Sequence, residues 1–173
     1  MKKLNKKKGI LFWITGLSGS GKTSLGKGIK SFIINKYGPT VILSGDDIRK
    51  IFKLNNYAKK NRLRYALSYS KFCQKITNQK INVIFSTVSL FDKVREWNKS
   101  NINNYVEIYI KSDIRRIIKL KKKYFYRKKV PNVLGQDIKA EFPKKSNITI
   151  NNNFKKPILK LSQELIKKID KTI

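Results

Sequence analysis

A single glycine-rich stretch, residues 16–23, holds the side chains best suited to chemistry, in the order Gly-Leu-Ser-Gly-Ser-Gly-Lys-Thr. This order matches the pattern G-x-x-x-x-G-K-[ST], in which backbone N–H groups surround the phosphate oxygens of a nucleotide. Lys22 would reach the β- and γ-phosphates, and the Thr23 hydroxyl would bind Mg²⁺. The residues expected to bind ATP are Gly16, Leu17, Ser18, Gly19, Ser20, Gly21, Lys22, Thr23 and Ser24.

Two other interpretations of this stretch are weaker. A chance glycine-rich turn would need no particular context, yet residues 10–15 are apolar and residues 22–37 carry apolar side chains at helical spacing. The dinucleotide fingerprint G-x-G-x-x-G fails because Ser24 stands where its third glycine would be. The stretch is therefore expected to be a phosphate-binding loop between a strand and a helix.

A second group of charged side chains follows the apolar run 40–43 and includes Asp46, Asp47 and Arg49. A carboxylate there could hold water on Mg²⁺ or accept the proton of an attacking hydroxyl, and Arg49 could hold an anionic substrate. The other role for such acids is to cap the N-terminus of a helix. We expect the catalytic and metal-binding role for Asp46 and the capping role for Asp47.

Alternating strands and helices must position these groups. The sequence predicts strands at 10–15, 40–43, 81–85, 105–110 and 148–150, and helices at 22–37, 62–79, 92–99, 114–120 and 157–173. This alternation predicts an α/β fold in one domain, with parallel strands joined by right-handed crossovers. Ligands in such sheets bind beyond the carboxyl ends of the strands. Residues 16–23, 44–49 and 86–91 are therefore expected to face one cleft.

The composition narrows the class of protein. The 173 residues are 40% hydrophobic, which suits a globular domain, and no apolar run approaches the length that crosses a membrane. The apolar run near the N-terminus continues into the glycine-rich loop, so it is expected to be a strand and not a signal peptide. The single cysteine, Cys73, excludes an internal disulfide and is expected in the core, and the absence of histidine excludes histidine catalysis. A reducing cytoplasm is the expected compartment.

The net charge of +31 has two explanations. A basic surface attracts nucleic-acid phosphates, which would make the chain a nucleic-acid-binding protein. Lysine, asparagine and isoleucine are abundant together, however, as expected from AT-rich coding, whereas a selected nucleic-acid surface would favour arginine and aromatic residues. We expect compositional bias to explain the charge, with no specific nucleic-acid partner, and a positive field that helps anionic substrates to arrive.

Three motifs together resemble the adenylyl-sulfate kinase family, over about residues 11–151. They are the loop at 16–23, the Gly-Asp-Asp-Ile-Arg that begins at Gly45, and the Ser-Thr-Val-Ser-Leu-Phe that begins at Ser86. In that family a P-loop kinase uses MgATP to phosphorylate the 3′-hydroxyl of adenosine 5′-phosphosulfate (APS). The resemblance implies a P-loop NTPase fold of three α/β/α layers with a mostly parallel sheet. It also implies a short lid at about 121–143, ATP and Mg²⁺ as cofactors, and possible homodimers.

The resemblance also assigns residues by position. It makes Lys22, Asp46 and Ser89 catalytic, with Asp46 as base or Mg²⁺ organiser, Thr23 and Asp46 as metal ligands, and Ser89 at the family's phospho-acceptor serine. The implied acceptor-binding residues are Arg49, Tyr57, Arg62, Val88, Ser89, Phe91 and Lys123. Tyr57 and Phe91 would stack on the base, although each could instead be a core aromatic residue. Lys123, Tyr126, Gly135 and Asp137 fall at lid positions of the family.

Several departures from the family pattern concern the acceptor side. Ser44 replaces an acid, Asp92 replaces an arginine, and residues 61–68 retain fewer arginines. The third motif is also similar to a sister group that phosphorylates cytidine diphosphoramidate in surface-polysaccharide synthesis. The expected function is an ATP-dependent kinase of a nucleotide's ribose hydroxyl, with APS as the favoured acceptor. Cytidine diphosphoramidate is the alternative acceptor, and nucleic-acid binding is the alternative of another class.

Overall fold

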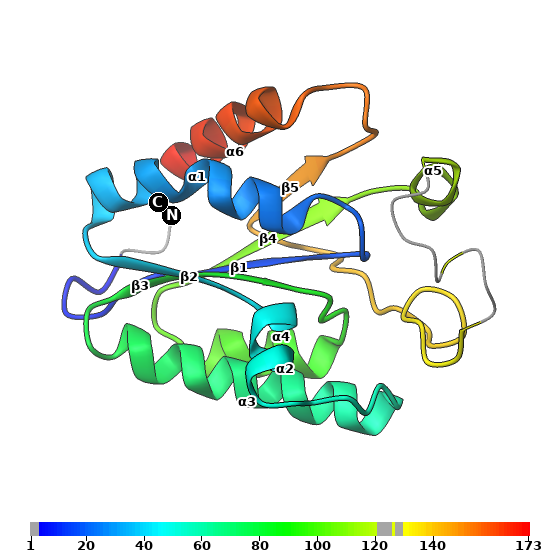
Figure 1. Cartoon of the computed structure of the whole chain (residues 1–173). Coiled ribbons are helices and arrows are strands. Elements are labelled where there is room, and N and C mark those ends of the chain that lie inside the picture. The colour runs from blue at the N-terminus through cyan, green and yellow to red at the C-terminus, as the bar shows by residue number, and fades with distance from the viewer. Residues whose placement is uncertain (1–3, 121–125, 127–129) are drawn as a thin grey trace.

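The chain folds around a five-stranded parallel sheet with the strand order β2-β3-β1-β4-β5 (Figure 1). The computed structural model describes residues 4–120, 126 and 130–173. The strands are β1 (Leu11–Gly16), β2 (Thr40–Ser44), β3 (Asn82–Thr87), β4 (Tyr105–Lys111) and β5 (Ile148–Asn151). Because β1 lies at the centre of this order, the glycine-rich loop that follows it lies at the middle of the sheet's carboxyl edge.

Helices cover both faces of the sheet. They are α1 (Lys22–Tyr37), α2 (Gly45–Ile51), α3 (Lys59–Thr77), α4 (Asp92–Asn101), α5 (Ile114–Lys119) and α6 (Ile158–Thr172). Figure 1 shows α1 and α6 together on one face and α2, α3 and α4 on the other. The α/β fold with three layers, expected from the alternation of the sequence, is confirmed.

The two faces of β1 supply two separate cores. Phe12 and Ile14 pack among the apolar side chains of α1 and α6, whereas Leu11 and Trp13 pack on the α3 and α4 side. Successive side chains of a strand point to opposite faces, so a strand covered on both sides must be apolar throughout. Cys73, in α3, is fully buried in the second of these cores, as the sequence predicts.

The observed helix boundaries differ from the expected ones mainly at α3, which begins at Lys59 and not at residue 62. The Arg62 N–H donates to the Ala58 carbonyl at 2.9 Å, so the helical turn already includes residues that were expected in a loop. Strand β2 continues directly into α2. The Ser44 hydroxyl accepts the Asp47 N–H at 3.1 Å and donates to the Asp47 carboxylate at 2.7 Å, which caps α2 and supports the capping role of Asp47.

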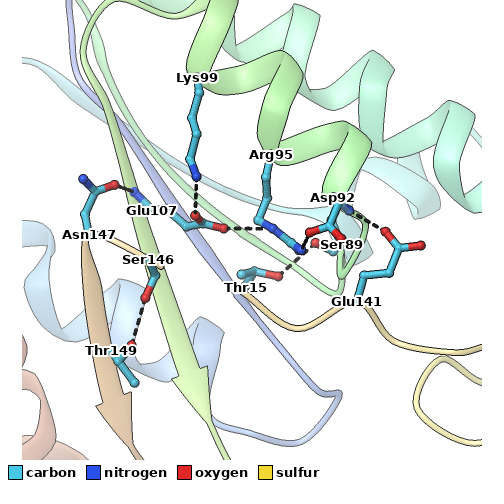
Figure 2. A network of polar contacts seen from close by, with 10 residues as sticks. All are labelled: Thr15, Ser89, Asp92, Arg95, Lys99, Glu107, Glu141, Ser146, Asn147 and Thr149. Atoms are coloured by element: carbon cyan, nitrogen blue, oxygen red, sulfur yellow. Dashed lines mark hydrogen bonds and ion pairs between the residues drawn. The ribbon is translucent and has the colours of Figure 1, made fainter. Parts of the chain in front are cut away.

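A buried ion pair joins α4 to β4. The buried Glu107 carboxylate lies between the sheet and α4, with the Arg95 Nε at 3.5 Å and the Lys99 Nζ at 3.8 Å (Figure 2). Arg95 also pairs with Asp92 at the start of α4. The Glu141 carboxylate accepts the Asp92 N–H at 2.5 Å, so the N-terminus of α4 is fixed from a segment far along the chain. These contacts fix the N-terminus of α4, and they therefore also restrain the segment that connects β3 to α4.

Candidate active site

The glycine-rich loop has the backbone geometry of an anion site. Gly19 and Gly21 adopt φ values of +82° and +93°, which favour glycine, and Gly21 directly precedes the first residue of α1. The Ser20 N–H donates to the Leu17 carbonyl at 3.2 Å, which closes the loop into a turn. The N-terminus of α1 then adds its partial positive charge to the backbone N–H groups of the loop.

A cavity of about 480 Å³ opens above this loop. Six of the nine residues expected to bind ATP line it, namely Ser18, Gly19, Gly21, Lys22, Thr23 and Ser24. The Lys22 Nζ donates to the Leu17 carbonyl at 2.7 Å, so the ammonium group lies against the loop itself. Gly16, Leu17 and Ser20 are buried and do not line the cavity. Their expected part in ATP binding remains a prediction.

The ends of β2 and β3 complete this cavity, as the topology predicts. Gly45, Asp46 and Arg49 line it from α2, and Ser86, Thr87 and Val88 line it from β3. Thr87 belongs to the stretch 86–91 that was expected to face the cleft, although no individual role was assigned to it. Three separate strand ends therefore meet around one space, and each supplies residues named by the sequence motifs: Lys22 and Thr23 after β1, Asp46 and Arg49 after β2, and Val88 after β3.

A second cavity of about 330 Å³ adjoins the first. Ser18, Asp46, Arg49 and Val88 line both cavities. The remaining walls of the second cavity come from Tyr57, Arg62, Tyr126, Val130, Pro131, Val133 and Leu134. Asp46 is one of these shared residues. Its side chain is 69% exposed, so its carboxylate is accessible from both cavities.

Two guanidinium groups give the second cavity a cationic wall. Arg62 lies 4.9 Å and Arg49 lies 5.8 Å from the centre of the Tyr57 ring. The Arg62 Nε donates to the Tyr57 carbonyl at 2.9 Å, and its NH2 donates to the Asn132 carbonyl at 2.7 Å. Burial, followed by repulsion from Arg49, lowers the pKa of Arg62. An anion between the two groups would relieve this repulsion.

The structure corrects one expectation about the end of β3. The side chains of Ser89 and Phe91 are 1% and 3% exposed, and neither lines either cavity. The Thr15 hydroxyl donates to the Ser89 carbonyl at 3.1 Å, and Phe91 packs in the core at the start of α4. The chain therefore turns inward after Val88. Phe91 has no face available to stack on a base in this arrangement, and the Ser89 hydroxyl is closed off from the cleft.

Other site residues were missed by the sequence motifs. Asn152, directly after β5, lines the first cavity, and its Nδ2 donates to the Ser20 carbonyl at 2.9 Å. Leu120, Phe154, Lys156 and Ile158 also line this cavity. A strand end at the same sheet edge was the available signal for Asn152. Lys123, expected to bind the acceptor, lies outside the described residues.

The oxygen groups present fit Mg²⁺ bound with a nucleotide. Thr23 and Asp46 both line the first cavity, and a hydroxyl and a carboxylate are ligands that Mg²⁺ accepts. Within the described ranges, no group of three or more histidine, cysteine, aspartate or glutamate residues could form an all-protein metal site. A magnesium ion would therefore depend on phosphate oxygens and water for its other ligands.

A parallel sheet whose central strand runs through this loop into a helix, with a second cavity beside the phosphate site, defines a P-loop phosphotransferase. The family model for adenylylsulphate kinase matches residues 8–151, and the chain belongs to that family. It is therefore a nucleotide-binding kinase. Among the described residues, no helix combines the length and apolar character needed to span a bilayer.

Individual relatives include kinases with two different acceptors. A cytidine diphosphoramidate kinase from Campylobacter jejuni is 32% identical over 163 residues, covering 92% of this chain and 95% of that protein. An adenylyl-sulfate kinase from Pseudomonas aeruginosa is 26% identical over 163 residues, covering 90% and 83%. The structure of an APS kinase from Mycobacterium tuberculosis in complex with AMPPNP and APS has a TM-score of 0.82. It is 19% identical and covers 94% of this chain and 98% of that one, which supports the fold.

Proposed function

We propose that this kinase transfers the γ-phosphoryl group of MgATP to a ribose hydroxyl of an anionic nucleotide. The observation that carries the proposal is the position of Asp46 on the wall shared by the two cavities. A phosphoryl group must pass from the donor to the acceptor at their junction, and a carboxylate at that place can accept the proton of the attacking hydroxyl.

Each residue around the junction has a distinct part in this scheme. The loop N–H groups and Lys22 would hold the β- and γ-phosphates and stabilise charge that develops during transfer. Thr23 and Asp46 would hold Mg²⁺, which neutralises phosphate charge when it is bound. Arg49 and Arg62 would hold the anionic group of the acceptor. Because in-line transfer needs no covalent enzyme intermediate, the closed position of Ser89 is compatible with direct transfer.

The acceptor would lie in the second cavity. Tyr57 is 43% exposed and offers an aromatic surface beside the two arginines, and Val130, Pro131, Val133 and Leu134 add an apolar lining to the same cavity. A base between an aromatic ring and aliphatic side chains is a common mode of nucleotide recognition. We further infer that residues 1–173 act as one kinase domain, in which the described part of the expected lid, residues 126 and 130–143, supplies this apolar wall.

We favour cytidine diphosphoramidate as the acceptor, and APS is the second candidate. The sequence motifs alone favoured APS, and the family model keeps it a candidate. The cytidine diphosphoramidate kinase of C. jejuni shares 32% identity over nearly the whole chain, compared with 26% for the adenylyl-sulfate kinase of P. aeruginosa. The loss of arginines from the acceptor motifs, and of the acid that Ser44 replaces, agrees with an acceptor other than the family's own. A homodimer in the cytoplasm remains a prediction.

An ADP-release assay with both acceptors tests the proposal. The purified chain with MgATP should turn over one of them at least tenfold faster than the other. The Lys22→Ala variant should lose most of this turnover, whereas Lys27→Ala, which removes an exposed lysine from the same helix, should retain it. No turnover with either acceptor, together with salt-sensitive RNA binding that ATP does not displace, would favour the nucleic-acid alternative.

A further inference from the structure

A much smaller cavity, of about 20 Å³, adjoins the second cavity on the side of α3. A space of this size admits one water-sized group. Four of its lining residues also line the second cavity, namely Arg49, Tyr57, Arg62 and Val88. The rest of its lining comes from Asn56, Tyr65, Ala66, Tyr69 and Thr87. This small cavity, called the recess below, is therefore an extension of the space proposed for the acceptor.

Small residues keep the recess open. Its lining residues from α3 are 62, 65, 66 and 69, and the spacing i, i+3, i+4, i+7 puts them on one face of the helix. Ala66 has the smallest side chain of the four. Gly45 has a similar effect from α2, because a Cβ there would lie 3.0 Å from the Thr87 Oγ1 and 3.5 Å from an Arg49 NH1. A larger side chain at either position would crowd the polar groups around the recess.

The Tyr69 hydroxyl is a buried polar group that the fold itself does not use. The side chain is 5% exposed, and in the described part of the chain no group meets its hydroxyl in hydrogen-bond geometry. The ring packs against Phe85 with the ring centres 5.5 Å apart, which fixes its direction. Burial raises the pKa of Tyr69, although the nearby Arg49 opposes the shift, so the hydroxyl keeps its proton at neutral pH. A buried hydroxyl without a partner is destabilising, so a ligand that supplies a partner gains affinity from it.

The charges around the recess favour an anionic ligand. The guanidinium groups of Arg49 and Arg62 both line it, and its described lining includes no carboxylate. Asp46 pairs with Arg49 but lines only the two larger cavities. Two cations beside a neutral hydroxyl suit a group that carries negative charge and also offers an atom for a hydrogen bond.

We propose that Tyr69 is a specificity-determining residue, whose hydroxyl binds the terminal anionic group of the acceptor, with one atom of that group in the recess. This inference rests on the proposed function, because it assigns the second cavity to the acceptor. Both candidate acceptors end in a tetrahedral anionic group, a sulfate in APS and a phosphoramidate in cytidine diphosphoramidate. A tyrosine hydroxyl donates to an oxygen of either group and can also accept an N–H of the second. The nucleoside lies in the larger second cavity, so Tyr69 acts on the terminal group alone.

Calorimetry with the full-length chain, without ATP, compares Tyr69→Phe with the wild type. An acceptor that binds the wild type should bind Tyr69→Phe about tenfold more weakly. The monophosphates AMP and CMP lack the terminal group and should bind both proteins equally. If the acceptors bind both proteins equally, the recess admits water alone and the inference is overturned. If the monophosphates are weakened as much as the acceptors, Tyr69 contacts the 5′-phosphate, which also overturns it.

Urea unfolding separates this role from a structural one. Tyr69→Phe should unfold at the same urea concentration as the wild type or a higher one, because the lost hydroxyl was buried without a partner among the described residues. A loss of stability would contradict the proposal by showing that the hydroxyl supports the fold. Tyr37→Phe is the matched control: it removes a buried hydroxyl on the other face of the sheet and should bind acceptors like the wild type. Failure of both acceptors to bind the wild type would refute the proposed function and this inference with it, whereas acceptor binding that Tyr69→Phe leaves unchanged refutes the inference alone.

Discussion

Asp46 and Arg49 form an ion pair across the first turn of α2, and both residues line both cavities. The Ser44 cap fixes the start of this short helix, which lies directly at the end of β2. A carboxylate that pairs with a guanidinium has a defined direction. One helical turn therefore presents the proposed base and an anion-binding group to the same place between donor and acceptor.

Replacement of Asp46 by asparagine should lower kcat by about 10²- to 10⁴-fold, because the amide cannot accept the hydroxyl proton. The affinity for AMPPNP without magnesium should change less than about threefold. Steady-state kinetics and calorimetry measure the two effects. Asp170→Asn removes another carboxylate that pairs with a basic residue, Lys36, at the surface, and should leave kcat unchanged. A kcat of Asp46→Asn within threefold of the wild type would remove Asp46 from the mechanism.

The substitution Arg62→Lys should raise the KM for the nucleotide acceptor about tenfold and leave the KM for ATP nearly unchanged. Arg62 contacts the Tyr57 and Asn132 carbonyls from two separate nitrogens, Nε and NH2, whereas a lysine offers all its donors from one nitrogen and so loses this geometry. Initial-rate kinetics with either substrate varied separates the two constants. Arg64→Lys, at an exposed position of the same helix, is the control and should have no effect. Equal increases in both KM values would contradict an acceptor-specific role for Arg62.

The substitution Asn152→Ala should weaken nucleotide binding and destabilise the fold by about 1–3 kcal/mol. It leaves the buried Ser20 carbonyl without the Nδ2 donor that now lies 2.9 Å away. Binding of AMPPNP and urea unfolding measure the two losses. Asn151→Ala, at the exposed neighbouring position, should show neither loss. If the two variants behave alike, Asn152 does not support the loop.

The pH dependence of stability should report the buried Glu107. Desolvation raises the pKa of its carboxyl, although Arg95 and then Lys99 oppose the shift. The folded state therefore holds this proton to a higher pH than the unfolded state does, and its contribution to stability is lost as pH rises above the ordinary value of 4.5. The stability of Glu107→Gln relative to the wild type should therefore increase from pH 4.5 to pH 7.5.

Urea unfolding of both proteins at the two pH values checks this prediction. The other titratable groups are the same in both proteins, so their effects cancel when the two free energies of unfolding are subtracted. A stability difference that stays constant with pH, or that decreases, would show that folding does not raise the pKa of Glu107. In that case attraction to Arg95 and Lys99, which lie 3.5 Å and 3.8 Å from its carboxylate, would dominate over desolvation.

Residues 16–23 could be assigned from the sequence because their chemistry depends on the local backbone and on glycines at fixed spacing. The strand order around β1 was not predicted, but the meeting of strand ends at one edge followed from parallel topology alone. Phe91 shows the limit of this argument. A strand-end rule places the backbone at the cleft, whereas the direction of a side chain four residues after the end of β3 depends on how α4 packs on the sheet.

Residues 130–138, which form part of the wall of the second cavity, could not be predicted for a different reason. Residues 121–143 carry no periodic pattern, because a turn unit held by Asp137 and Gly135 needs no repeating apolar spacing. The ion pair between Glu107 and Arg95 could not be predicted either. Glu107 lies within a predicted strand, and nothing in the sequence indicates that Arg95, twelve positions earlier, would lie beside it. Such contacts between residues distant in the sequence depend on how the helices pack on the sheet, so a local sequence pattern does not predict them.

The position of Cys73 gives this kinase an internal reporter of its own unfolding. The thiol is the sole one in the sequence, lies with no exposed surface in α3, and has a pKa that burial raises strongly. A maleimide or disulfide reagent should therefore label only molecules in which α3 has separated from the sheet. At reagent concentrations where labelling outpaces reclosing, the labelling rate of the unmodified chain yields the frequency of that opening event, with or without nucleotide, and without an engineered probe.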